Sequence, residues 1–151
     1  MKTDTRARAL LAIGRDAEAQ KLLVGIKARH DVATNPYPSD WAANALYFPV
    51  ELPGLMGDLA GVRAAVLDFE SRIAHDAWGE KEYFPAIARA FANAGDAASA
   101  FDYVEKMAKR NGPATYLQFT IMPAFDNLRD HPRYLTLKKN YEIWAESNPH
   151  E

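Results

Sequence analysis

The residues most often used in catalysis or metal binding are few in this chain, and they are not spaced for either purpose. The four histidines are His30, His75, His131 and His150, and no two share the i, i+4 spacing that would place both imidazoles on one helix face. The chain has no cysteine, which excludes disulfides, thiolate metal sites and cysteine nucleophiles. The sequence therefore predicts no metal and no cofactor.

The remaining signals for catalysis are weak. His75 and Asp76 are adjacent, but they stand at the expected end of a helix, where a histidine commonly interacts with the last carbonyls. Carboxylates are plentiful, yet an acid/base pair needs two of them held together in a cleft, and nothing selects a pair. Phosphate loops, dinucleotide fingerprints and G-x-S-x-G elbows are absent. We expect a non-catalytic protein. One alternative is an enzyme or small-molecule sensor with an internal pocket, supported only by His75 and the aromatic residues of Trp41–Phe48.

The composition indicates which elements must position these residues. The 151 residues include 27 alanines but only six each of valine, isoleucine and threonine. Alanine is the best helix former, whereas β-branched residues favour strands. The chain length fits a single domain. We therefore predict one all-α domain over residues 1–151.

Charge and hydropathy narrow the range of partners. The net charge of −2 gives no general attraction for nucleic acid. No apolar run approaches the roughly 20 residues that span a bilayer. The charged start of the chain, followed by a short apolar stretch over residues 9–13, is unlike a signal peptide. We expect a cytoplasmic protein that binds neither nucleic acid nor membrane.

A pattern built on three glycines recurs along the chain. Gly14, Gly57 and Gly95 lie 43 and 38 residues apart, and an aspartate follows each within two positions. Glycine can close a helix in the left-handed conformation, and aspartate can cap the helix that follows. Small or apolar residues recur five, nine and twelve positions after each glycine, on one face of that second helix. The pattern predicts three helical hairpins.

The expected boundaries follow from these turns and from the prolines. We predict repeats over residues 5–30, 39–76 and 80–111, and a closing segment over 114–146 that covers the end of the array. Pro49 and Pro53 should end or kink the first helix of the second repeat near Phe48, so that residues 50–56 form a distorted turn or a short second piece. Asp130 is the expected cap of the last helix.

These segments resemble tetratricopeptide (TPR) repeats. The pairs Gly14/Ala19 and Gly95/Ala100 match the turn glycine and the small residue of that family, and Gly57/Val62 matches loosely. Phe84, Ile87, Ala88 and Phe91 stand where the family places its first-helix core. The phrase from Pro123 to Tyr134 looks like the one that closes TPR regions in many bacterial regulators. The resemblance implies a short right-handed solenoid with a C-terminal capping helix.

The resemblance also implies a function. First helices of TPR repeats line a concave groove that holds a peptide or a partner helix, so we expect a non-catalytic protein-interaction scaffold. Aligning the repeats by their glycines places these residues on the groove side: Arg8, Asn44, Tyr47, Glu51, Glu82, Arg89 and Asn93. Arginine can bind a carboxylate through two hydrogen bonds, and asparagine can form hydrogen bonds with the backbone of an extended peptide. A second alternative is a structural tail of a longer array that self-associates through its N-terminal helical face.

Overall fold

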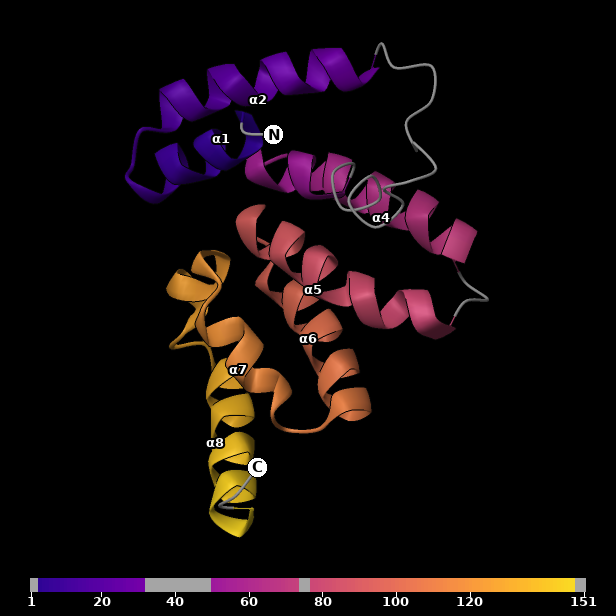
Figure 1. Cartoon of the computed structure of the whole chain (residues 1–151), viewed down its shortest axis with the longest axis vertical. Helices are drawn as coiled ribbons and strands as arrows, with labels where there is room; N and C mark the ends of the chain where they lie inside the picture. Colours follow the sequence, from indigo (N-terminus) through magenta and orange to yellow (C-terminus); the bar gives the residue numbers. More distant parts are fainter. Residues whose placement is uncertain (1–2, 32–49, 74–76, 149–151) are drawn as a thin grey trace.

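The described part of the chain is helical and contains no strand. The structure is a computed structural model that describes residues 3–31, 50–73 and 77–148, with side chains over 5–28, 50–71 and 83–148. A short helical segment, which we call the 50–55 helix, precedes α4. Figure 1 shows the other elements: α1 (Thr3–Ala12), α2 (Asp16–Asp31), α4 (Leu59–Ile73), α5 (Ala77–Asn93), α6 (Ala97–Asn111), α7 (Thr115–Thr120), the 3-10 helix η2 (Pro123–Leu128) and α8 (Pro132–Ser147). The predicted all-α class is confirmed for these residues.

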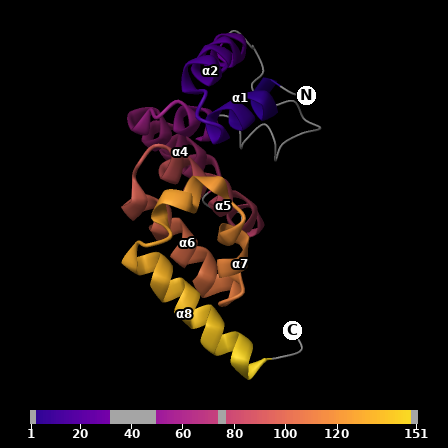
Figure 2. The ribbon, with the colours of Figure 1, turned by 90° about the vertical axis from the view of Figure 1, so that its left-hand side faces the viewer.

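From α1 to α6 the helices follow the long axis of the molecule in the order of the sequence, whereas η2 turns back to lie beside α5 (Figure 1). The pair α1 and α2 lies at one end and α8 lies at the other in both views (Figures 1 and 2). Between these ends, α5 and α6 pack along each other as α1 and α2 do. No helix in the described ranges is long and apolar enough to cross a lipid bilayer.

The three glycine turns share one backbone conformation. Gly14, Gly57 and Gly95 have φ values of 74°, 71° and 82°, in the left-handed region that side chains disfavour. In each turn the glycine N–H donates to the carbonyl three residues earlier, at 3.0 or 3.1 Å. The next N–H donates to the carbonyl five residues earlier, at 2.9 Å. This is the Schellman motif, so all three first helices end in the same way.

The aspartates after the glycines differ in their roles. Asp58 accepts a hydrogen bond from the Gly61 N–H at 2.8 Å, and Asp96 accepts one from the Ser99 N–H at 3.1 Å. Both are the caps that the sequence predicts. Asp16 is instead the first residue of α2, so the expectation that it caps this helix is wrong. From there its negative charge still favours the positive end of the helix dipole.

The second helix of each pair buries the positions that the glycine register predicts. Five residues after the glycines, Ala19, Val62 and Ala100 are fully buried. Nine and twelve residues after them, every side chain is at most 8 % exposed; these are Leu23, Ile26, Val66, Phe69, Val104 and Met107. One face of α2, α4 and α6 therefore contacts the neighbouring helices at equivalent positions.

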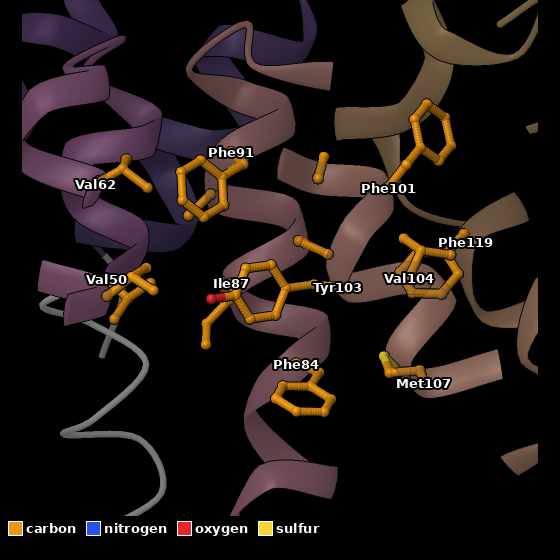
Figure 3. Close-up of a cluster of buried hydrophobic side chains, with 14 of the residues drawn as sticks. Val50, Val62, Phe84, Ile87, Phe91, Phe101, Tyr103, Val104, Met107 and Phe119 are labelled. Carbon is orange, nitrogen blue, oxygen red and sulfur yellow. The ribbon is translucent and has the colours of Figure 1, made fainter. Parts of the chain in front are cut away.

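Aromatic side chains from several helices fill the main core. Figure 3 shows its side chains reaching from the 50–55 helix and α4, through α5 and α6, to α7. The Phe91 ring stacks on Tyr103, with centroids 5.9 Å apart, and Phe119 meets Phe125 edge to face at 5.0 Å. The expected first-helix core of the third pair, Phe84, Ile87, Ala88 and Phe91, is buried. A smaller core joins α1 and α2 to the 50–55 helix through Ala7, Leu23, Ile26, Leu52 and Leu55.

Small residues let the 50–55 helix approach α5 closely. A Cβ added to Gly54 would lie 2.6 Å from the Ala90 carbonyl oxygen, inside any permitted contact distance. Ala86, Ala88 and Ala90 of α5 are almost fully buried. The alanine excess thus serves close packing as well as helix propensity. Of the two alternatives that the sequence leaves for residues 50–56, the structure shows the short second piece: the 50–55 helix, which contains Pro53. Phe48 and Pro49 lie outside the described residues.

The last helix, α8, begins with a histidine cap and not an aspartate cap. His131, and not the expected Asp130, caps α8: its Nδ1 accepts a hydrogen bond from the Arg133 N–H at 3.2 Å. The His131 ring stacks on Phe101, with ring centroids 4.7 Å apart, so this histidine has a structural role. Tyr134 is the buried residue of α8, and Arg129 donates to its hydroxyl at 3.0 Å.

Candidate functional site

A buried carboxylate joins three helices that are distant in sequence. Both oxygens of Glu51, on the 50–55 helix, accept hydrogen bonds: Oε2 from Arg8 of α1 and Oε1 from Arg89 of α5. The Glu51 side chain is 6 % exposed, whereas those of Arg8 and Arg89 are 32 % and 30 % exposed. The two arginine side chains are therefore partly exposed, whereas the carboxylate is buried.

Local sequence explains why the three charged residues converge. Each follows or lies between buried apolar residues: Ala7 precedes Arg8, Val50 and Leu52 flank Glu51, and Ala88 and Ala90 flank Arg89. These neighbours fix the rotation of each helix about its axis. Because the neighbours are mostly small, the helices approach closely enough for the long arginine side chains to meet over Glu51.

The arginines line a cleft that runs over several elements. Its volume is about 230 Å³. The lining comes from α1, the 50–55 helix, α5 and η2: Arg8, Leu11, Ala12, Leu55, Arg89, Asn93, Pro123 and Ala124. The cleft thus combines an apolar wall with two guanidinium groups and one amide. It has the composition of a binding site that holds an apolar group and orients a polar one.

The charges in this cluster do not cancel. Arg8 and Arg89 contribute two positive charges and Glu51 one negative charge, so these three residues together carry +1. A carboxylate as deeply buried as that of Glu51 requires paired charges, because an isolated buried charge is strongly destabilising. The cluster therefore connects α1, the 50–55 helix and α5.

The structure brings four of the predicted groove residues together and leaves three undescribed. Arg8, Arg89 and Asn93 line the cleft, and Glu51 lies under the two arginines. Asn44 and Tyr47 lie outside the described residues, and so does the Glu82 side chain. These four lie six or two residues before a turn glycine, and the equivalence of the three turns explains why they lie together.

Sequence reasoning missed the apolar half of the cleft. Leu11, Ala12 and Leu55 resemble ordinary core residues of an amphipathic helix, so their types give no signal. Pro123 and Ala124 belong to η2, which packs against α5 after the chain has turned back. Finding them needed the path of the closing segment, which the repeat pattern does not give.

A second cleft lies between α6 and α8 and is dominated by a structural ion-pair network. Its volume is about 440 Å³. Arg133 donates to Glu105 at 2.6 Å, to Asp102 at 2.7 Å and to the Ala98 carbonyl at 3.1 Å. The hydrogen bond from Arg133 lowers the pKa of Glu105, and burial opposes this only in part. The arginine thus fastens the N-terminal end of α8 to α6.

The described residues give little support to catalysis. Within the described ranges, no group of three or more His, Cys, Asp or Glu side chains could hold a metal ion. His75, Asp76 and His150 lie outside those ranges, as do the Trp41–Phe48 aromatics and the His30 side chain. Tyr103 donates to Glu70 at 2.5 Å, and burial, with this hydrogen bond, raises the pKa of Tyr103 well above its usual value. The hydroxyl of Tyr103 therefore stays protonated.

In comparisons with known proteins, no protein-family model, curated protein or solved structure matches the chain.

Proposed function

We propose that the chain is a TPR-like interaction domain that binds an extended peptide in the cleft formed by α1, the 50–55 helix, α5 and η2. The proposed architecture is a short right-handed solenoid of three helical hairpins, closed by α7, η2 and α8. Three equivalent Schellman turns support it, as does the burial of equivalent positions after each glycine. The order of α1, α2, α4, α5 and α6 along the long axis also suits it (Figure 1).

The single observation that carries the function is the position of the cleft. It crosses the first helices of all three proposed hairpins, so its lining comes from equivalent faces of successive repeats. An extended peptide needs hydrogen-bonding groups for its backbone and shallow apolar contacts for its side chains. Asn93 can form hydrogen bonds with the peptide backbone, and Arg8 and Arg89 can bind acidic groups of the peptide. Leu11 and Leu55 can contact its apolar side chains.

The ion-pair cluster alone is explained equally well by stability, so the test must separate binding from folding. Asn93 lines the cleft but has no part in the Arg8–Glu51–Arg89 cluster. Asn93→Ala should therefore weaken binding without unfolding the protein. Asn111→Ala is the matched control, because Asn111 is the last residue of α6 as Asn93 is of α5, and it is absent from the cleft lining.

A library of immobilised random peptides provides the measurement. Wild type should bind a subset of the peptides, and Asn93→Ala should lose about tenfold in affinity for that subset, equal to about 1.4 kcal/mol. Asn111→Ala should bind as wild type does. Equal affinities for all three proteins, or no binding by wild type, would remove the proposal.

A further inference from the structure

The cleft between α6 and α8 has an apolar surface beyond its ion-pair network. Its volume of about 440 Å³ falls within the range of about 300–1,000 Å³ that is usual for small-molecule sites. Ala108 of α6, Pro113 after α6 and Leu137 of α8 provide the apolar part of the lining, and each is partly buried. An apolar group placed between these three residues would therefore contact both sides of the cleft.

The ion pair between Arg133 and Glu105 marks one end of this cleft. These two residues come first in the lining on α8 and on α6, and Arg133 also donates to Asp102. The charged groups at this end thus have partners within the protein, and they bridge the two helices. An extended chain that ran along the helices would meet this bridge. The cleft therefore suits a short molecule better than an extended peptide.

Further along the cleft, two polar side chains remain for a ligand. Lys109 lies one turn after Glu105 on α6, and Asn140 lies two turns after Arg133 on α8. Within the described ranges, the side chains of Lys109 and Asn140 form no hydrogen bond or ion pair, and the Lys109 charge acts on Glu105 only at longer range. The lysine ammonium can donate to an anion, and the asparagine amide can both donate and accept.

We infer that the cleft between α6 and α8 binds a small monocarboxylate with an apolar body. The carboxylate pairs with Lys109 and accepts a hydrogen bond from Asn140, while the apolar body contacts the three apolar lining residues. One negative charge is favoured over two because the carboxylate of Glu105, one turn from Lys109, repels a second. This site shares no lining residue with the peptide cleft, so the inference goes beyond the proposed function.

The probes are phenylacetate and three compounds that each change one of its features. Phenylacetamide lacks the charge, acetate lacks the apolar body, and phenylmalonate adds a second carboxylate. Binding is measured at neutral pH from backbone amide shifts in NMR titrations of wild type, Lys109→Met and Lys139→Met. Methionine keeps much of the length of lysine without its charge. Lys139 is the matched control, because it is an exposed lysine of α8 that does not line the cleft.

Wild type should bind phenylacetate with a Kd below about 5 mM, a modest affinity for a ligand of this size. The largest shifts should lie at Ala108, Leu137 and Asn140. Phenylacetamide and phenylmalonate should each bind about threefold more weakly, as expected for one exposed ion pair, and acetate about tenfold more weakly. Lys109→Met should lose the preference for phenylacetate over phenylacetamide, and Lys139→Met should keep it.

No saturable binding of phenylacetate would overturn the inference, as would equal wild-type affinities for phenylacetate and phenylacetamide. Loss of the preference in both lysine variants would also overturn it, because the effect would then not belong to the cleft. These outcomes leave the proposed function standing, since the peptide cleft is lined by other residues.

A peptide C-terminus offers the same chemical groups as a small acid, so a further probe separates the two sources. Acetyl-Gly-Gly-Phe with a free C-terminus carries both a benzyl group and a carboxylate. It should bind more weakly than phenylacetate, because the bridge between Arg133 and Glu105 obstructs a longer chain. Tighter binding of this peptide than of phenylacetate would overturn the inference of a small acid.

Discussion

At the scale of single residues, the Arg8–Glu51–Arg89 cluster contributes to the stability of the fold and also borders the proposed binding cleft. The Glu51 carboxylate is buried, and each arginine supplies one of its two ion pairs. Removing one arginine leaves a buried carboxylate only half satisfied. A surface pair in water has no such consequence, because solvent replaces the lost partner. The cluster should therefore respond to substitution quite differently from an exposed pair.

Arg89→Ala should lower the free energy of unfolding by about 3 kcal/mol, since it leaves Glu51 with one charged partner. Arg63→Ala is the matched control: Arg63 pairs with Asp96 at 2.9 Å, but its side chain is 64 % exposed. We expect its loss to cost less than about 1 kcal/mol. Urea denaturation measures both values. Equal costs would show that the buried pair contributes no more than the exposed one.

At the scale of elements, the contact between the 50–55 helix and α5 sets the width of the cleft. Gly54→Ala should destabilise the protein by about 2–3 kcal/mol, because the new methyl group would collide with the Ala90 backbone. Gly95→Ala is a useful comparison, since its Cβ meets nothing within 4 Å and only the positive φ opposes it. We expect about 1 kcal/mol there. Thermal melts measure both losses of stability. A larger loss for Gly95→Ala than for Gly54→Ala would contradict the close approach of the 50–55 helix to α5.

Asp96, the N-terminal cap of α6, should make the stability of the protein depend on pH. Burial raises the pKa of Asp96, but hydrogen bonds from Ser99 and Arg63 outweigh it, so the pKa lies below its usual value. A lowered pKa in the folded state stabilises the protein above the ordinary value near 3.8, and this contribution is lost as the pH falls through the folded pKa. Asp96→Asn keeps a capping side chain without this dependence. The stability advantage of wild type over Asp96→Asn should therefore shrink from pH 6 to pH 3. A difference independent of pH would rule out the lowered pKa.

The same elements show what the sequence can and cannot predict. The positive φ of Gly14, Gly57 and Gly95 was predictable, because only glycine occupies that conformation readily and the register repeats. The cap of α8 was assigned to Asp130 because aspartate is the commoner cap, whereas the stacking of His131 on Phe101 fixes His131 at that position. The role of Gly54 was not predictable, since it depends on contact with Ala90, more than thirty residues further along the chain. A local sequence pattern does not predict contacts between segments that are far apart in the chain.

At the scale of the whole molecule, two hydrophobic cores share the 50–55 helix. Val50 belongs to the main core with α5 and α6, whereas Leu52 and Leu55 belong to the smaller one with α1 and α2. Glu51 lies between them in sequence and ties α1 to α5 across the cleft. The 50–55 helix is therefore the element that sets the position of the first hairpin relative to the rest, and with it the shape of the cleft.

Binding of a peptide in this cleft is tested most directly by NMR mapping. Backbone amide shifts are recorded while a peptide selected by wild type from the random library is added. The largest shifts should gather at the cleft, on Arg8, Leu11, Leu55, Asn93 and Ala124. Shifts gathered instead on the cleft between α6 and α8, at Lys109, Thr136 and Asn140, would contradict the claim.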